Sequence, residues 1–352
     1  MERRQEARRT GAGTAGARLP RATHGLLAPF CTVVLCGCAG STFTVIEEND
    51  VFSLSGNTDE HYTQGLRASW IFPTEQAPLL VRKVVDAAPV PTATTEAIGL
   101  FVGQEMYTPT NIRARRLLRD DRPYAGWLYG GIVVANVVRT EDGREGDTLD
   151  SYELQLGVVG SSSLADVTQK RWHELIDADR PRGWRNQLDD EPGVVVSWEH
   201  RRRLLHGWGE EFAQFDAIGG PGVSVGNVFT NGRAELLLRV GDLPRDFGVN
   251  TIHSSVAEVG APEDELDGLK WYVFAAGEAR GVVRNIFLDG NTSGDSHDVD
   301  KEHGVYEGAA GVALHWGNWR VTFSQNVRSS EFDGQHGSQD FGSVSLTYQC
   351  DF

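Results

Sequence analysis

The sequence predicts an all-β fold, namely an antiparallel β-barrel of the kind that spans a bacterial outer membrane. Three features lead to this class: an export signal at the N-terminus, repeated segments in which every second residue is apolar, and a final segment of this pattern that ends in Phe352. Strands that alternate in this way can face lipid on one side and a wet interior on the other. After the leader, no apolar run approaches the roughly 20 residues that a transmembrane helix needs.

The composition excludes several classes of protein. Hydrophobic residues make up 40% and charged residues 23% of the 352-residue chain, so the chain is neither disordered nor a helical membrane protein. The formal net charge is −16, and removing residues 1–39, which hold six arginines and two glutamates, leaves 27 basic against 47 acidic residues, or −20. A chain this acidic repels a phosphate backbone, so we expect no nucleic-acid partner.

Residues 1–39 have the layout of a secretory signal peptide. An arginine-rich stretch precedes an apolar run at residues 26–35, and small residues follow it. About ten apolar residues are too few to span a bilayer, which disfavours a membrane anchor. The alternative is a lipidated Cys38, because residues 35–38 loosely match a lipidation site. We therefore expect export through this leader and a single domain formed by residues 40–352. Only Cys350 then survives with certainty, so the domain must be stable without an internal disulfide.

Four oxygen-bearing side chains stand together at the start of the first expected strand. They are Glu47, Glu48, Asn49 and Asp50. Clustered carboxylate and amide oxygens suit a hard cation such as Ca²⁺, although the spacing is not that of an EF-hand loop. The sequence contains no CxxC, HExxH or P-loop motif, which excludes zinc-finger, zincin and NTPase interpretations.

Segments with period-2 alternation recur along the chain and predict strands. The clearest are residues 154–158, 236–240, 271–279, 310–316 and 319–323. The last two are separated by Gly317 and Asn318, which predict a short hairpin turn. Polar stretches at 139–150, 241–268 and 289–304 are expected to be loops. Soluble sandwiches alternate in the same way, so these segments alone do not identify a membrane barrel.

One stretch, residues 164–176, has helical rather than strand character. Its apolar side chains lie near one stripe of a helix: Leu164, Val167, Trp172, Leu175 and Ile176. Gln169 and His173 are four residues apart and therefore share a face. In a chain made mostly of strands, we expect this helix to lie in a long loop.

His173 is one of ten histidines, and a structural role is the alternative to a chemical one. Its surroundings favour chemistry, since Lys170 and Arg171 precede it and the following residues 180–192 are dense in Trp, Arg and amide side chains. Such groups suit a large amphiphilic anion, because arginine pairs with phosphates in a fork. A solvated loop is the other interpretation of residues 180–192.

Residues 222–226 spell GxSxG around Ser224, the pattern of a nucleophile elbow. That motif requires a strand before the serine and a helix after it. The following residues carry no helix signal, so we expect Ser224 to lie in a glycine-rich strand or turn and not to be a nucleophile.

The last segment distinguishes a membrane barrel from a soluble sandwich. From Val344 to Phe352 every second residue is apolar, the residues between them are polar, and the terminal residue is aromatic. Such a strand suits a lipid-facing wall around a wet lumen. A terminal aromatic residue is also what the bacterial barrel-assembly machinery recognises.

Taken together, several blocks of the chain resemble the lipid A deacylase (LpxR-type) family of outer-membrane enzymes. The blocks run in order along the sequence, at residues 48–52, 59–67, 104–109, 120–129, 157–160, 169–173, 183–188, 226–230, 288–292 and 344–352. The resemblance implies a barrel of about twelve strands, with a short helix in an extracellular loop. It places the active site near the extracellular rim, between the barrel wall and that helix.

The resemblance also implies roles for individual residues. The catalytic histidine of the family corresponds to His173 and its helix neighbour to Gln169. Thr63 matches the family's threonine, and Asn49 and Asp50 match its paired metal-site residues. A lysine of the family has no lysine counterpart here, and Arg113 is the nearest cation, which we expect to bind substrate.

The function implied is Ca²⁺-dependent hydrolysis of the 3′-acyloxyacyl ester of lipid A in a Gram-negative outer membrane. Lipopolysaccharide and the bilayer are then the partners. Ester hydrolysis needs a base for water and positive charge for the developing oxyanion. A histidine can act as the base near neutral pH, and a bound Ca²⁺ can supply the charge. The alternatives are a non-enzymatic barrel such as a porin or structural protein, and a serine-type phospholipase that uses Ser224 beside a histidine.

Overall fold

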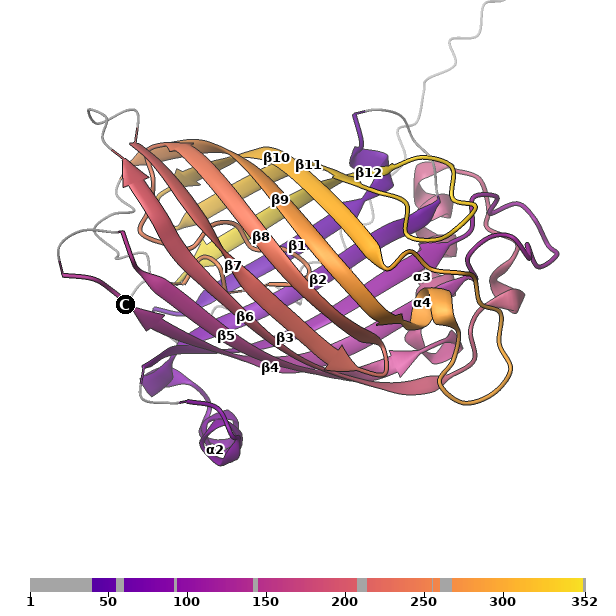
Figure 1. The fold of residues 1–352 in the computed structure, drawn as a ribbon, viewed down its shortest axis with the longest axis horizontal. Coiled ribbons are helices and arrows are strands. Elements are labelled where there is room, and N and C mark those ends of the chain that lie inside the picture. Colours follow the sequence, from indigo (N-terminus) through magenta and orange to yellow (C-terminus); the bar gives the residue numbers. More distant parts are fainter. Residues whose placement is uncertain are drawn as a thin grey trace, which may run out of the picture. The chain divides into compact units, whose positions relative to one another are not determined.

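The computed structural model describes residues 40–54, 60–91, 94–141, 145–207, 214–254, 256–259 and 268–350. Twelve antiparallel strands in these ranges form a closed barrel, in which β1 pairs with β12 (Figure 1). The barrel and its number of strands confirm the predicted fold class. The expected signal peptide, with Cys38, and the terminal Phe352 lie outside the described residues.

The strands are long and their connections vary in length. The strands are β1 Thr42–Asn49, β2 His61–Pro73, β3 Thr95–Thr108, β4 Ala125–Val138, β5 Thr148–Val159, β6 Glu191–Gly207, β7 Gln214–Gly226, β8 Phe229–Gly241, β9 Leu269–Asn285, β10 Gly304–Trp316, β11 Trp319–Arg328 and β12 Gln339–Gln349. The helices are α2 Leu79–Ala87, α3 Ala165–Ile176 and α4 Ile286–Asp289. The sequence pattern predicts α3 but neither α2 nor α4. None of the helices in the described ranges is long and apolar enough to cross a membrane.

Alternation along each strand separates an apolar outer surface from a polar interior. In β9, Trp271 and Val273 are exposed on the outside, whereas Tyr272 between them is buried inside. In β12, Leu346 is exposed and Thr347 is buried toward the lumen, where it donates a hydrogen bond to Glu258 (2.9 Å). The predicted strands therefore have the faces that their alternation indicates. Exposed apolar side chains all around a barrel wall are typical of lipid contact.

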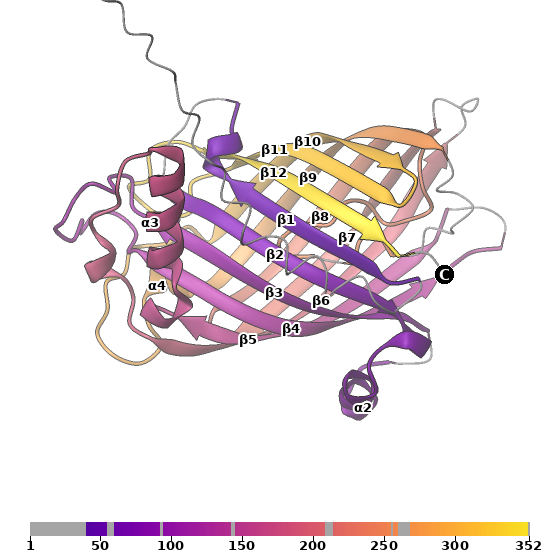
Figure 2. The same ribbon diagram turned by 180° about the vertical axis from the view of Figure 1, so that it is seen from behind.

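The two ends of the barrel differ. Thr42 of β1 lies opposite Gln349 of β12, so both ends of the barrel sequence lie at one rim, here called the inner rim. The opposite end, here called the outer rim, carries the connections 109–124, 160–190, 286–303 and 329–338. Figures 1 and 2 show α3 and α4 at this outer rim, away from the C-terminus. Outer-membrane barrels usually place their longer loops on the extracellular side.

The connection between β8 and β9 enters the barrel from the inner rim. Residues 241–268 are predicted as a polar loop, and in their described part no regular strand or helix occurs after Gly241, the last residue of β8. However, Phe247, Ile252 and Val256 are fully buried there, and Arg67 of the barrel wall donates a hydrogen bond to the carbonyl of Ile252 (2.7 Å). The prediction missed this inward packing because the apolar residues of the loop have no regular period. Residues 242–254 and 256–259 are called the plug below.

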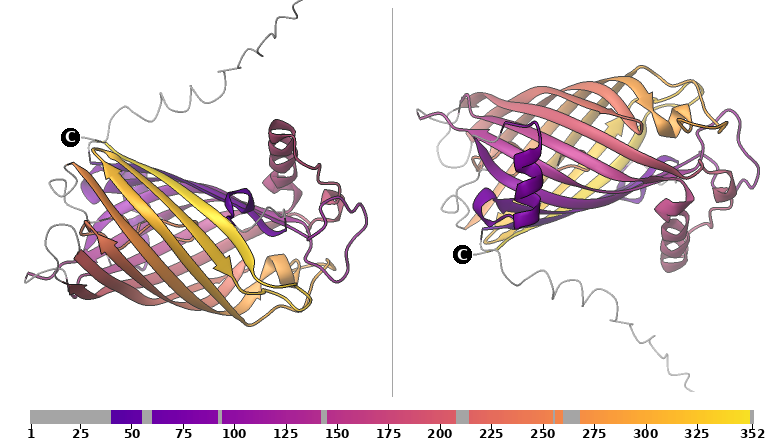
Figure 3. Two further views of the ribbon diagram at one scale, coloured as in Figure 1. Left: turned by 90° about the horizontal axis from the view of Figure 1, so that it is seen from above. Right: turned by 90° about the horizontal axis from the view of Figure 1, so that it is seen from below.

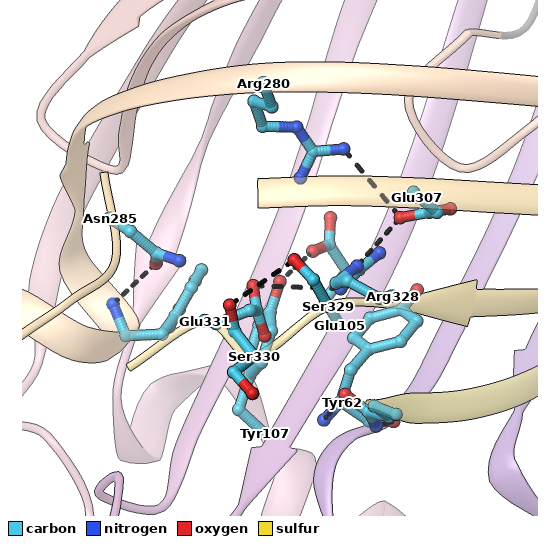
Figure 4. Close-up of polar contacts among 12 residues, drawn as sticks. Tyr62, Glu105, Tyr107, Arg280, Asn285, Glu307, Arg328, Ser329, Ser330 and Glu331 are labelled. Carbon is cyan, nitrogen blue, oxygen red and sulfur yellow. Dashed lines mark hydrogen bonds and ion pairs between the residues drawn. The ribbon is translucent and has the colours of Figure 1, made fainter. Parts of the chain in front are cut away.

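Ion pairs fill much of the lumen around and above the plug. Asp246 of the plug pairs with Arg239 and, at 2.7 Å, with Arg320. Nearer the outer rim, Arg328 lies between Glu307 (2.8 Å) and Glu331 (3.9 Å), as Figure 4 shows. Buried pairs of this kind contribute little net stability, but removing one partner leaves a costly unpaired charge. The lumen of the described barrel is therefore packed with side chains and is not a wide water-filled channel.

Candidate active site at the outer rim

Helix α3 lies against the outside of the barrel wall. In β3, Glu105 and Tyr107 face the lumen, so Gln104 and Met106 face outward by alternation. The Gln104 amide donates a hydrogen bond to the carbonyl of Ser163, two residues before α3 (2.6 Å). Gly126 of β4 also permits this approach, because a Cβ there would overlap Ser163 and Ala165. The wall and the helix thus form one unit at the outer rim.

Both ends of α3 are held by specific contacts. Before it, the turn at Ser161–Ser163 is held by Asp190, whose carboxylate accepts hydrogen bonds from Ser161 Oγ (3.0 Å) and from the Ser162 amide (2.7 Å) and hydroxyl (2.5 Å). These bonds, those from Ser162 above all, lower the pKa of Asp190 below its usual 3.8. After the helix, Asp177 adopts the left-handed conformation (φ 57°), which ends it.

The buried face of α3 is polar. Ala165, Gln169 and His173 follow one another at intervals of four residues, and the last two are only 1% and 2% exposed. The apolar stripe points away from the wall, with Trp172 and Leu175 exposed. A helix on the surface of a water-soluble protein buries its apolar stripe and exposes its polar side chains. The outer side of this wall faces lipid instead, so α3 exposes its apolar side chains and buries its polar ones.

His173 is held in one tautomer by the chain that follows the helix. Its Nδ1 is hydrogen-bonded to the backbone carbonyl of Asp179. A carbonyl oxygen can only accept, so Nδ1 carries the proton and the lone pair of the neutral ring is on Nε2. Arg113, the predicted substrate-binding cation, forms an ion pair with the carboxylate of this same Asp179, on the exposed surface of the rim.

Gln169 is oriented by a tryptophan that the sequence analysis did not single out. Gln169 Oε1 accepts a hydrogen bond from the indole of Trp184 (2.7 Å), and Trp184 is buried beside Tyr124, Ala165 and Met106. The amide nitrogen of Gln169 is buried too, and no residue in the described ranges accepts a hydrogen bond from it. It is therefore a donor available on the face of α3 that carries His173. Trp184 belongs to the segment 180–192 that the sequence marks as rich in Trp, Arg and amides.

The predicted metal-site residues lie at the outer end of β1. Glu48 faces the lumen, where its carboxylate accepts from the Tyr62 hydroxyl (2.9 Å), so Glu47 and Asn49 face outward. Asn49 Oδ1 accepts from the amide of Val51 (2.9 Å) and fixes the turn in which Asp50 is buried. The cluster of four oxygen-bearing side chains is thus divided, since Glu48 faces the lumen whereas Asn49 donates a hydrogen bond to Glu47 (3.4 Å) on the outer face.

Thr63 connects this end of β1 to the wall beneath α3. The pairing of β1 and β2 sets Asn49 opposite Gln64, so Asp50 and Thr63 are the next residues along the two chains. Thr63 lies at a bulge, and its hydroxyl is hydrogen-bonded to that of Thr108 (2.7 Å). Thr108 follows Met106 on the outward face of β3, and Met106 packs with Trp184. The predicted residues of β1, β2 and α3 therefore lie on the outside of the wall at one rim.

Ser224 belongs to a different part of the molecule. It lies in β7 with its hydroxyl bonded to that of Ser197 (2.8 Å), and both residues line a lumen cavity that also includes His253. The chain continues from β7 through a hairpin into β8 rather than into a helix. The strand predicted around Ser224 is confirmed, and the geometry of a nucleophile elbow is absent from these described residues.

A family model and the solved structure of a similar outer-membrane protein agree with this architecture. The family model described as "Outer membrane protein LpxR" matches residues 26–350. Among solved structures, LpxR from Salmonella typhimurium is similar with a TM-score of 0.69 and 18% identity, over 88% of this chain and 100% of that chain. The β-domain of the Bordetella autotransporter BrkA is similar with a TM-score of 0.42 and 11% identity, over 89% of this chain and 100% of that chain. A comparison with curated proteins found no match.

Proposed function

Because the chain belongs to the LpxR family of outer-membrane proteins, we propose that it is a lipid A deacylase. The reaction is hydrolysis of the 3′-acyloxyacyl ester, which releases the acyloxyacyl chain as a carboxylic acid and leaves a hydroxyl on the sugar. The observation that supports this most is the position of His173. A buried histidine with a fixed tautomer faces the barrel wall from a helix at the outer rim, beside the free amide donor of Gln169.

In this proposal His173 is the general base. Nε2 takes a proton from water while the water oxygen attacks the ester carbonyl carbon, and the proton then passes to the departing sugar oxygen. The carbonyl of Asp179 holds the ring in the required tautomer and stabilises its protonated form. Gln169 donates its amide hydrogen to the substrate or to the attacking water. No serine nucleophile is needed, in agreement with the position of Ser224 in a strand of the lumen.

We further propose that Asn49 and Asp50 hold Ca²⁺, with Thr63 beside them. No three His, Cys, Asp or Glu side chains of the described residues form a cluster that could hold a metal by themselves. The donor set would therefore combine the Asp50 carboxylate with amide, hydroxyl, backbone and water oxygens, which Ca²⁺ accepts readily. When bound, the ion would supply positive charge for the oxyanion that develops on the ester carbonyl.

The surface around the site suits an anionic lipid with acyl chains. The apolar stripe of α3, including Trp172 and Leu175, is exposed on the side away from the wall. Arginines are exposed on the neighbouring loops, namely Arg113, Arg115, Arg116, Arg119, Arg180, Arg182 and Arg185. Guanidinium groups bind phosphates well, and apolar side chains at a rim contact acyl chains. We therefore propose lipid A in the outer leaflet as the substrate. Residues 1–39 would act as the signal that directs the protein out of the cytoplasm to this membrane.

The porin alternative is disfavoured by the lumen. Phe247 and Ile252 of the plug are buried inside the barrel, and ion pairs such as Arg67–Glu153 (2.7 Å) cross the interior. A diffusion channel needs a continuous wet path, which these side chains obstruct in the described barrel.

Mass spectrometry of lipid A tests the proposal directly. Cells that express the protein should lose the 3′-acyloxyacyl chain, and His173→Asn should lower the rate by on the order of 10²–10⁴, since it removes the base. Ser224→Ala should stay within a few-fold of wild type. Heat-dependent gel migration should be the same in all three proteins, because neither substitution touches the pairing of strands. Unchanged lipid A, or full activity in His173→Asn, would contradict the proposal, and an inactive Ser224→Ala would favour a serine esterase.

A further inference from the structure

Helix α2, in the connection between β2 and β3, exposes more apolar surface than a helix in water would. Leu79, Leu80 and Val84 are 67%, 75% and 46% exposed. Val81 and Val85, by contrast, are buried. At 100° per residue, Leu80, Val84 and Ala87 occupy a flank next to this buried pair, whereas Arg82, Lys83 and Asp86 lie on the other side. Leu79 lies among these polar residues, so the uncovered apolar sector of α2 is the flank formed by Leu80, Val84 and Ala87.

The buried pair packs on the outer surface of the barrel wall. Val81 and Val85 form a cluster with Phe72 of β2, Ile98 of β3 and Val134 of β4. These strand residues belong to the outward face, since Leu66 and Val102, at equivalent alternating positions, are exposed on the outside. The lipid-facing wall therefore continues without interruption into the uncovered flank of α2.

The position and direction of α2 match one boundary of a membrane. In Figure 1 the helix lies at the end of the barrel that holds the C-terminus and is seen end-on, and the right panel of Figure 3 shows it from the side. Its axis therefore runs across the length of the barrel. A helix in this direction at the inner rim lies parallel to the plane of a bilayer that surrounds the wall.

We propose that α2 is an interfacial helix that binds the phospholipid leaflet at the inner rim. Leu80 and Val84 insert between acyl chains, and Arg82 and Lys83, both exposed, contact the phosphates of the headgroups. This lipid contact continues the one already made by the wall and depends only on the barrel's position in a membrane, not on the proposed enzyme activity. It anchors β2 and β3 at the leaflet opposite the one reached by α3.

Site-directed fluorescence on the whole barrel tests this proposal. With Cys350→Ser as background, Leu80→Cys and Asp86→Cys are each labelled with an environment-sensitive fluorophore and reconstituted in vesicles of phosphatidylethanolamine and phosphatidylglycerol. The label at position 80 should be quenched several-fold more by lipids spin-labelled in the acyl chain than by aqueous iodide. The label at position 86, on the polar side, should show the reverse order. Heat-dependent gel migration verifies that both variants are folded.

The contradicting results are equally defined. A label at position 80 that iodide quenches as strongly as the label at position 86 places α2 in water and overturns the proposal. If the label at position 80 is protected from iodide only at a high ratio of protein to lipid, a second copy of the chain covers this flank. That result would overturn the proposal too. The charge component is tested by Arg82→Gln/Lys83→Gln, which should reduce acyl-chain quenching at position 80, and more in these anionic vesicles than in purely zwitterionic ones, whose phosphates are balanced by ammonium groups. Unchanged quenching in both vesicle types would contradict the proposed phosphate contacts.

Discussion

At the scale of single residues, the hydrogen-bond partners of the two polar side chains of α3 give them different capacities. His173 bonds through Nδ1 to a carbonyl, which leaves Nε2 as its basic atom. Gln169 uses its oxygen for Trp184 and keeps its amide hydrogens. One side chain is thus prepared to accept a proton and the other to donate a hydrogen bond, on the same buried face.

The first prediction at this scale concerns Asp50. Asp50→Asn keeps the shape of the side chain but removes its charge, so Ca²⁺ should bind more weakly. We expect deacylation to fall by at least the roughly 10–100-fold that changes in the surroundings of a metal site cost. Excess EDTA should stop the wild-type reaction and added Ca²⁺ should restore it. Asp86→Asn, at the exposed surface of α2, is the control and should respond like wild type. Full wild-type activity in excess chelator would show that the reaction does not require a metal ion.

The sequence identifies most of these residues but not their surroundings. Gln169 and His173 are paired by a spacing of four, and Asn49, Asp50 and Thr63 lie in blocks that resemble the family. The partners Trp184 and Asp179 come from tertiary contacts with a loop of irregular structure, which no local pattern encodes. Thr108 meets Thr63 only because of a bulge in β2, and bulges leave no reliable signal in a single sequence.

At the scale of elements, α3 depends on the turn that precedes it. Asp190 gathers three hydrogen bonds from Ser161 and Ser162, and these bonds connect the start of α3 to the strand β6 that follows the loop. The pKa of Asp190 is lowered because these hydrogen bonds, those from Ser162 above all, favour its charged carboxylate, so the charged form stabilises the turn. This stabilisation is present above the usual aspartate pKa and is lost as pH falls through the lowered one.

We therefore predict that Asp190→Ala loosens the start of α3 without opening the barrel. The loss is comparable to that of a helix cap, about 1 kcal/mol. Hydrogen exchange of residues 165–176 should be faster in the variant at pH 7. The difference should vanish in acid below the lowered pKa, where the wild-type carboxyl is protonated. Asp120→Ala, at an exposed position of the same rim, provides the control. Identical exchange of wild type and Asp190→Ala at pH 7 would show that the turn does not support the helix.

The elements also show where sequence patterns reach their limit. Period-2 alternation predicts the strands well, because it follows directly from a wall between lipid and lumen. The helical stripe predicts α3 but does not say which face packs on the wall, and the structure buries the polar face and exposes the apolar one. Helix α2 is too short for its apolar residues to show a clear helical period. The apolar residues of the plug have no regular spacing at all.

At the scale of the whole molecule, the plug and the ion pairs determine whether ions and small solutes can pass through the barrel. Asp246 lies where wall and plug meet and is bonded to Arg239, to Arg320 and to the amide of Gly248 (3.2 Å). One carboxylate of the plug thus binds two arginines of the wall, each of which also pairs with a second acid, Arg239 with Asp216 (2.7 Å) and Arg320 with Glu258 (3.2 Å). The plug is held by charge as well as by its buried Phe247 and Ile252.

We predict that the wild-type barrel conducts little current in a planar lipid bilayer. Asp246→Asn weakens both arginine contacts, so brief openings should become more frequent and thermal stability should fall. The loss should stay below the roughly 3–5 kcal/mol expected when a buried charge loses its partner completely. Asp242→Asn, at the half-exposed start of the plug, serves as the control and should remain closed. A steady, porin-like current through the wild type would contradict the closed lumen and revive the channel alternative.

The pairing of β1 with β12 has a consequence for how the protein is made. The ring of hydrogen bonds closes between the first and the last strand of the chain, so no closed state exists until the final residues have been synthesised. Contacts between such distant parts of a sequence form slowly, and open strand edges invite aggregation in the meantime. We therefore expect partners that cover the open strand edges until β12 has paired with β1.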